Sequence, residues 1–157
     1  MGELTHTDKN GRARMVDVSN KDESLRTAVA SGSIKMNKEI IEKVIAQEIK
    51  KGDVINTAKI SGINAAKRTW ELLPLCHQVK LTSIDLDFEI SKQDNKITAF
   101  STVKGYDRTG VEMEALTAVS TCLLTIYDMC KALSKDMIIG DIKLLKKTGG
   151  RSDFSKR

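Results

Sequence analysis

The chain has 157 residues and a net charge of +5, with 30% charged, 40% hydrophobic and only 4% aromatic residues. This length and composition are typical of a single globular domain, 1–157, with a hydrophobic core. Scarce aromatic residues argue against a protein that stacks single-stranded nucleic acid, and the apolar runs fall short of the roughly 20 residues of a membrane helix. The start lacks a signal-peptide pattern, and the three cysteines have neither metal-site nor disulfide spacing, so we expect reduced thiols and a cytoplasmic location.

The positive charge is concentrated at the end of the chain. Residues 143–157 carry six basic side chains and one acidic side chain, so this segment accounts for the whole excess. We predict a mobile basic tail there. A localised positive end indicates an anionic partner, and nucleic acid, an acidic membrane and a polyphosphate nucleotide all carry that charge.

The first elements in chain order are two short strands and a helix. Alternation predicts a strand over 14–18 and a weaker one over 27–35. Apolar residues then recur at helical spacing from an N-cap at Asn37 to a stop at Gly52.

A second predicted helix runs from its N-cap at Asp53 to Pro74, the only proline. One face of this helix is rich in small residues, at Thr57, Ala58, Ser61, Gly62, Ala65 and Ala66. Small side chains let another backbone approach closely, so we expect tight packing of this face against a neighbouring element.

The second half predicts a hairpin, a long helix and a last strand. The hairpin pairs 83–90 with 96–103, the helix covers about 111–133, and the strand covers 137–145. This order predicts an α+β fold in which helices gather on one face of an antiparallel sheet.

The long helix has an apolar face and a polar face. Leu116, Val119, Leu123, Ile126, Cys130 and Leu133 are predicted to face the core. The opposite stripe is rich in threonine and comprises Glu114, Thr117, Thr121, Thr125, Asp128, Lys131 and Lys135. Because threonine is a poor helix former, the stripe predicts a lined cavity or an interface, although a solvated face with an ordinary ion pair is the alternative.

A lysine can act as an acid or a base near neutral pH only if its pKa is lowered. Burial or a second cation would lower the pKa of Lys131, whereas Asp128, three residues away, would raise it. The sequence alone leaves the direction of the Lys131 pKa shift open.

Three further stretches favour anion binding or proton transfer. His77 follows the rigid stop at Pro74, and a histidine in a defined position is a residue type suited to proton transfer, although a helix-ending turn in which it binds backbone is the alternative. Lys51 precedes a helix N-terminus, where an anion is favoured, although a surface lysine at a glycine turn is the alternative. The glycine pair of 147–152 lets backbone amides approach a phosphate, but the full P-loop spacing is absent.

Six ordered stretches give the chain a close resemblance to the cyclic pyranopterin monophosphate synthase family of molybdenum cofactor biosynthesis. They are Lys51-Gly52-Asp53-Val54, Ala65-Ala66-Lys67-Arg68-Thr69-Trp70, Leu73-Pro74-Leu75-Cys76-His77, Gly110-Val111-Glu112-Met113-Glu114-Ala115-Leu116-Thr117-Ala118, Thr125-Ile126-Tyr127-Asp128-Met129-Cys130-Lys131-Ala132 and Lys147-Thr148-Gly149-Gly150-Arg151-Ser152. One departure is Gln78, where the family usually has a second proline; we expect it to loosen the loop without removing the imidazole.

The resemblance implies a ferredoxin-like fold and a homohexamer, a trimer of dimers with active sites at the dimer interfaces. It implies a lyase that converts 3′,8-cyclo-7,8-dihydroguanosine 5′-triphosphate, made from GTP, into cyclic pyranopterin monophosphate and pyrophosphate. The catalytic residues that it implies are Asp128, Lys51 and Lys131. The substrate-binding residues are Leu75, Cys76, His77, Glu112, Met113 and Glu114, with Arg26, Lys67, Lys147 and Lys156 as triphosphate contacts.

The implied partners are the purine nucleotide triphosphate and further copies of the chain, with no nucleic acid and no membrane. No cofactor or dedicated metal site is expected, although Mg²⁺ could accompany the phosphates. Two other functions stay open: a non-catalytic oligomer that binds purine nucleotides in the same pocket, and an RNA-binding module that would rest on the basic tail alone.

Overall fold

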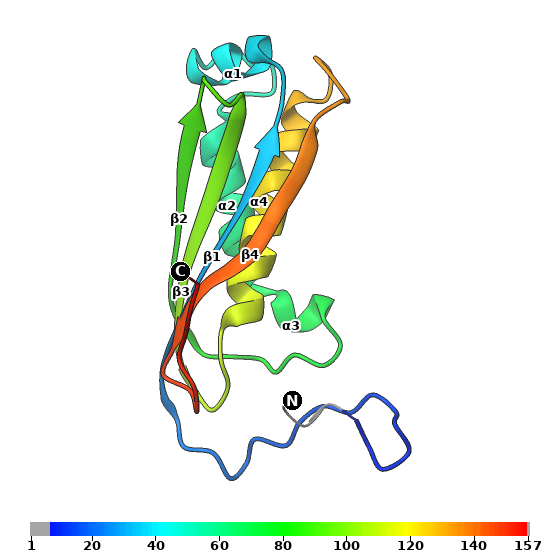
Figure 1. Cartoon of the computed structure of the whole chain (residues 1–157), viewed down its shortest axis with the longest axis vertical. Helices are drawn as coiled ribbons and strands as arrows, with labels where there is room; N and C mark the ends of the chain where they lie inside the picture. Colours follow the sequence, from blue (N-terminus) through cyan, green and yellow to red (C-terminus); the bar gives the residue numbers. More distant parts are fainter. Residues whose placement is uncertain (1–6, 157) are drawn as a thin grey trace.

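The computed structural model describes residues 7–156, which form one antiparallel sheet with helices on one face (Figure 1). The strands are β1 (Ser24–Lys35), β2 (Leu81–Ser91), β3 (Lys96–Asp107), β4 (Ile138–Thr148) and β5 (Phe154–Ser155). The helices are α1 (Lys38–Ile45), α2 (Val54–Lys67), α3 (Thr69–Leu72) and α4 (Glu112–Cys130). Within the described residues no helix is both long and apolar enough to span a bilayer.

The strand order is β2-β3-β1-β4-β5, and every neighbouring pair is antiparallel. Without the short β5, the elements follow the βαββαβ sequence of ferredoxin-like folds, with α2 and α4 as the two long helices. The α+β prediction with helices on one face is therefore confirmed.

The core lies between the sheet and the pair α2 and α4. Alternate side chains of β1 and β3 point to this side, and Ala28, Ala30, Ile34, Ile97, Ala99 and Val103 are fully buried. Four predicted core positions of α4, Val119, Leu123, Ile126 and Cys130, are also fully buried. Leu133 lies beyond the end of α4 and is exposed, so the core prediction was wrong there.

The small-residue face of α2 packs against α4, as the sequence predicted. A side chain at Gly62 would collide with the Cys122 thiol and approach the Ala118 carbonyl oxygen to 3.1 Å. Next to this contact, the Ser61 and Thr125 hydroxyls lie 2.7 Å apart in a hydrogen bond. The threonine stripe of α4 therefore bonds in part to α2 of the same chain.

Among the described residues one predicted strand is absent, and two predicted helices end earlier than expected. Residues 14–18 are irregular and lie along the outside of the fold, because alternation alone supplies no neighbouring strand. The helix that begins after Asn37 ends at Ile45, two residues before Gln47 takes a left-handed φ of 58°. The helix after Asp53 breaks at Arg68, which separates α2 from α3.

The weak strand predicted over 27–35 is the central strand β1 of the sheet. Its small residues have a packing role, because a side chain at Gly32 would meet Val119 and Leu123 of α4 within 3 Å. The predicted mobile tail also needs correction. Its first residues, up to Thr148, belong to β4, where Lys147 pairs with Ala28 of β1, and β5 then folds back on β4.

Candidate functional site

An ion-paired cluster, which we call the lysine–aspartate cluster, joins Lys51, Asp128 and Lys131 at the C-terminal end of α4. Lys51 Nζ donates to Asp128 Oδ2 at 2.9 Å and to the Asp128 carbonyl oxygen at 2.7 Å. Lys131 Nζ lies 2.7 Å from Asp128 Oδ1. Asp128 and Lys131 face the same side because they are three residues apart near the helix end. Lys51 reaches them from the turn before α2, where Gly52 takes a φ of 103° and the Asp53 side chain caps the helix.

The charges of this cluster stabilise one another. Lys131 and then Lys51 hold the pKa of the Asp128 carboxyl down at about 2. In return, the hydrogen bond to Asp128 raises the pKa of Lys131 above its ordinary value. All three side chains are about half exposed, so burial does not reverse this effect. Of the two directions that the sequence left open for Lys131, the chain adopts the raised pKa, which keeps the ammonium charged, makes it a weaker acid and suits it to stabilising negative charge.

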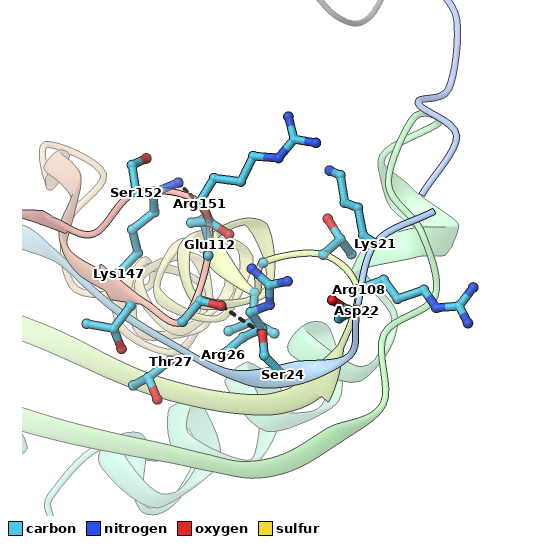
Figure 2. Close-up of a pocket in the computed structure, with 16 residues that line it drawn as sticks. Lys21, Asp22, Ser24, Arg26, Thr27, Arg108, Glu112, Lys147, Arg151 and Ser152 are labelled. Carbon is cyan, nitrogen blue, oxygen red and sulfur yellow. Dashed lines mark hydrogen bonds and ion pairs between the residues drawn. The ribbon is translucent and has the colours of Figure 1, made fainter. Parts of the chain in front are cut away.

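A basic pocket lies at the opposite end of α4 (Figure 2). Its volume is about 490 Å³, and its wall is formed by the start of β1, the loop between β3 and α4, and the glycine turn after β4. The cationic side chains in its wall are Lys21, Arg26, Arg108, Lys147 and Arg151. Gly149 makes the turn at a φ of 88°, and its carbonyl accepts a hydrogen bond of 2.7 Å from the Ser24 hydroxyl. Such a concentration of cations beside a glycine turn is suited to a polyphosphate.

Two carboxylates also line the basic pocket. Glu112, the first residue of α4, forms an ion pair of 3.0 Å with Lys147, and Asp22 lies on the opposite wall. Five cationic against two anionic side chains leave the wall positive. The N-terminal end of α4 adds the partial positive charge of its free N–H groups.

A second, more apolar pocket of about 310 Å³ adjoins the first. The two share Lys21, Thr109, Gly110 and Glu112. The wall of this apolar pocket contains Val16, Val18, Leu75, Cys76, His77, Val79, Met113 and Glu114. The His77 imidazole does bind backbone, because Nε2 lies 2.8 Å from the Val16 carbonyl oxygen. A carbonyl can only accept, so Nε2 carries the proton and Nδ1 is the atom left to accept one in the neutral ring.

Glu114 is the most unusual titratable group in the apolar pocket. The sequence put it on the polar stripe of α4, but only 4% of the residue is exposed. Burial, reinforced by the nearby charge of Glu112, raises the pKa of the Glu114 carboxyl to about 7. Burial and the charge of Glu114 in turn raise the pKa of the Cys76 thiol. The Glu114 carboxyl therefore keeps its proton at much higher pH than an ordinary glutamate and, when protonated, can donate a hydrogen bond.

This buried carboxyl predicts a measurable dependence of stability on pH. Its pKa of about 7 in the folded chain lies above the ordinary 4.5, so the folded state binds the proton more tightly. Wild-type stability should fall as the pH rises from 4.5 to 7 and level off above that, by up to about 3 kcal/mol. Glu114→Gln should lack this fall and be the more stable protein at pH 8.

Urea unfolding at pH 4.5 and pH 8 would measure the difference. The exposed Glu89→Gln on β2 is the matched control and should keep the wild-type dependence. Parallel pH profiles for Glu114→Gln and wild type would contradict the raised pKa.

The predicted site residues thus fall into two separate groups. Lys51, Asp128 and Lys131 are together, and Arg26, Lys147 and the residues from 75–77 and 112–114 line the two pockets. Lys67 and Lys156 lie outside both pocket linings. Glu112 and Asp128 are 16 positions apart on α4, which corresponds to about 24 Å at 1.5 Å per residue, so one chain does not bring the two groups together.

The sequence did not single out Lys21 and Arg108 as site residues. Lys21 contributes to both pockets, and Arg108 contributes to the basic pocket while donating to the Ser19 carbonyl oxygen at 3.2 Å. Neither residue belongs to a motif with recognisable spacing. The only signal for Arg108 was its place just before the glycine that opens α4.

Comparisons of the sequence with known proteins identify its family. The MoaC family profile matches residues 15–150. A protein named cyclic pyranopterin monophosphate synthase from Thermoanaerobacter sp. (strain X514) is 51% identical, over 98% of both chains. A protein of the same name from Roseiflexus sp. (strain RS-1) is 52% identical over 98% of both chains. Another from Clostridium perfringens (strain SM101 / Type A) is 53% identical over 95% of this chain and 94% of its own. A match over nearly the whole chain at this identity leaves one conclusion: the chain belongs to the MoaC family.

Proposed function

We propose that this protein is a cyclic pyranopterin monophosphate synthase. It would convert 3′,8-cyclo-7,8-dihydroguanosine 5′-triphosphate into cyclic pyranopterin monophosphate and pyrophosphate, an early step of molybdenum cofactor biosynthesis. The observation that carries the proposal is the pair of adjoining pockets, one lined by five cationic side chains and one mostly apolar. A nucleotide triphosphate has two matching parts: an anionic phosphate chain, which suits the cationic pocket, and a ring system, which suits the apolar pocket.

The pockets suggest how the substrate lies. The triphosphate would occupy the basic pocket, where Arg26, Lys147 and Arg151 supply charge-assisted hydrogen bonds of about 1.5–3 kcal/mol each. The guanine-derived rings would occupy the adjoining pocket, against Met113 and Leu75. Mg²⁺, where it accompanies the triphosphate, would be held mainly by the phosphate oxygens.

We further propose that a second copy of the chain completes the active site. The lysine–aspartate cluster is about half exposed and lies at the C-terminal end of α4, whereas both pockets lie at its N-terminal end. In a dimer with antiparallel α4 helices, the cluster of one chain could meet the pockets of the other. This arrangement fits the homohexamer, a trimer of dimers, which the family resemblance implies.

The chemistry would then divide between the two groups. The ring rearrangement needs several proton transfers, during which negative charge develops, and the ammonium groups of Lys51 and Lys131 are suited to stabilise that charge. Asp128 holds both ammonium groups in place. In the pocket, the partly protonated Glu114 and the Nδ1 of His77 are the groups placed to exchange protons with the rings.

A product assay tests the function. Purified protein incubated with the cyclised triphosphate should release pyrophosphate and form the pterin in equal amounts. Binding of GTP without turnover of any triphosphate would favour the non-catalytic nucleotide-binding oligomer instead. RNA binding with a steep salt dependence, which nucleotide could not displace, would favour the RNA-binding module. We also propose a cytoplasmic location, which the three free cysteines support.

A further inference from the structure

Glu112 holds an anionic group inside a pocket that we expect to bind anions. Its carboxylate lies 3.0 Å from Lys147 Nζ, and the two side chains are only 26% and 33% exposed. A side chain added at Gly110 would collide with the Glu112 carboxyl group, so the carboxylate folds back over the backbone just before α4. Figure 2 shows the pair between the glycine turn and the start of the helix.

This position coincides with the place where a phosphate would be stabilised. The N-cap of α4 is Val111, whose apolar side chain cannot accept hydrogen bonds from the first turn of the helix. Its N–H groups therefore favour an anion, and Glu112 already supplies one. An incoming phosphate would use both the helix end and Lys147, so it has to displace the carboxylate from its partner.

We infer that Glu112 is an internal competitor for phosphate, which weakens the hold of the basic pocket on pyrophosphate and so speeds product release. The inference rests on the proposed function, because it takes pyrophosphate to be a product. The cationic side chains of the wall favour phosphate binding, whereas the Glu112 carboxylate opposes it.

The competition affects product more than substrate. Pyrophosphate is held by the basic pocket alone, whereas the substrate is also held by its rings in the adjoining pocket. A wall with five cationic side chains and no competing anion would retain pyrophosphate and slow each turnover, because product release limits many enzymes. A carboxylate that replaces the departing phosphates keeps Lys147 paired as the pocket empties.

The test is the affinity of the full-length protein for inorganic pyrophosphate, measured by titration calorimetry. Glu112→Gln should bind pyrophosphate about three- to tenfold more tightly than wild type, because it loses one partly shielded ion pair and one anion at the helix end. The inhibition constant of added pyrophosphate in the turnover assay should fall by the same factor.

Asp22→Asn is the matched control, because it removes the same charge from the same pocket. Among the described residues Asp22 takes part in no ion pair, so its effect should be less than half as large. In a Lys147→Met background, the effect of Glu112→Gln should shrink at least by half, since the cation for which Glu112 and phosphate compete is gone.

Circular dichroism would verify that each variant is folded, and Glu112→Asp serves as the second variant if Glu112→Gln is not folded. A shorter side chain would reach Lys147 poorly, so this variant should bind pyrophosphate more tightly than wild type.

Unchanged or weaker pyrophosphate binding by the folded Glu112 variants would overturn the inference. So would equal effects of Glu112→Gln and Asp22→Asn, which would reduce the role of Glu112 to general charge. These failures are distinct from failure of the proposed function, which appears as a wild-type protein that forms neither product. A wild type that turns over substrate while the Glu112 variants bind pyrophosphate no better would refute the inference alone.

Discussion

Lys51→Ala and Lys131→Ala are each expected to lower kcat about 10²–10³-fold, the usual cost of removing a group that stabilises charge as it develops in the reaction. The dissociation constant of the substrate should change much less, by about threefold or below, because the triphosphate is held mainly by the five cationic side chains of the basic pocket. In the dimer they would meet the reacting rings of the substrate bound to the other copy. Asp128 keeps Lys131 in its charged form, and that charge is needed in the reaction more than in binding.

Single-turnover kinetics together with direct substrate titration would separate the two quantities. Lys38→Ala is the matched control, because it also breaks an exposed lysine–carboxylate pair, with Glu42, but lies on α1 outside the cluster. It should retain wild-type kcat. Equal losses in kcat and in substrate affinity for Lys51→Ala would assign that lysine to binding and contradict the catalytic role.

Local chemistry made much of the fold predictable. Asn37 and Asp53 accept hydrogen bonds from the backbone N–H groups three residues on, as the capping pattern predicted. The hairpin of β2 and β3 also followed from simple alternation. By contrast, β1 looked weak because its centre consists of small residues. Their role depends on α4, about 90 residues later in the chain, which packs directly on Gly32.

The candidate site was predictable only in part. The Asp128–Lys131 pair follows from helical spacing, but Lys51 is 77 residues from Asp128 and was linked to it only through the family resemblance. Nothing in the sequence pattern marked Glu114 as buried, because its neighbours on the stripe are polar. Its burial arises from tertiary structure, where the loop with Leu75 and Cys76 and the N-terminal segment with Val16 meet the first turn of α4.

Two inactive variants should restore activity to each other if two chains form each active site. One variant carries Lys51→Ala in the lysine–aspartate cluster, and the other carries Lys147→Ala with Arg151→Ala in the basic pocket. In a two-fold dimer of one variant with the other, one site contains both defects and the opposite site contains none. Random pairing of co-expressed chains should therefore give about a quarter of wild-type activity, since half of the dimers are mixed and each has one intact site.

Co-purification through different tags on the two chains, followed by the product assay, would measure this recovery. The control co-expresses Lys51→Ala with Lys131→Ala. Both lysines contact the same Asp128 carboxylate, at 2.9 and 2.7 Å, so no mixed dimer regains an intact cluster and activity should stay low. Absence of recovery in the first pair, with mixed assemblies present, would mean that one chain supplies both groups. Because the two groups lie about 24 Å apart along α4 of one chain, that result would mean that they serve different ligands.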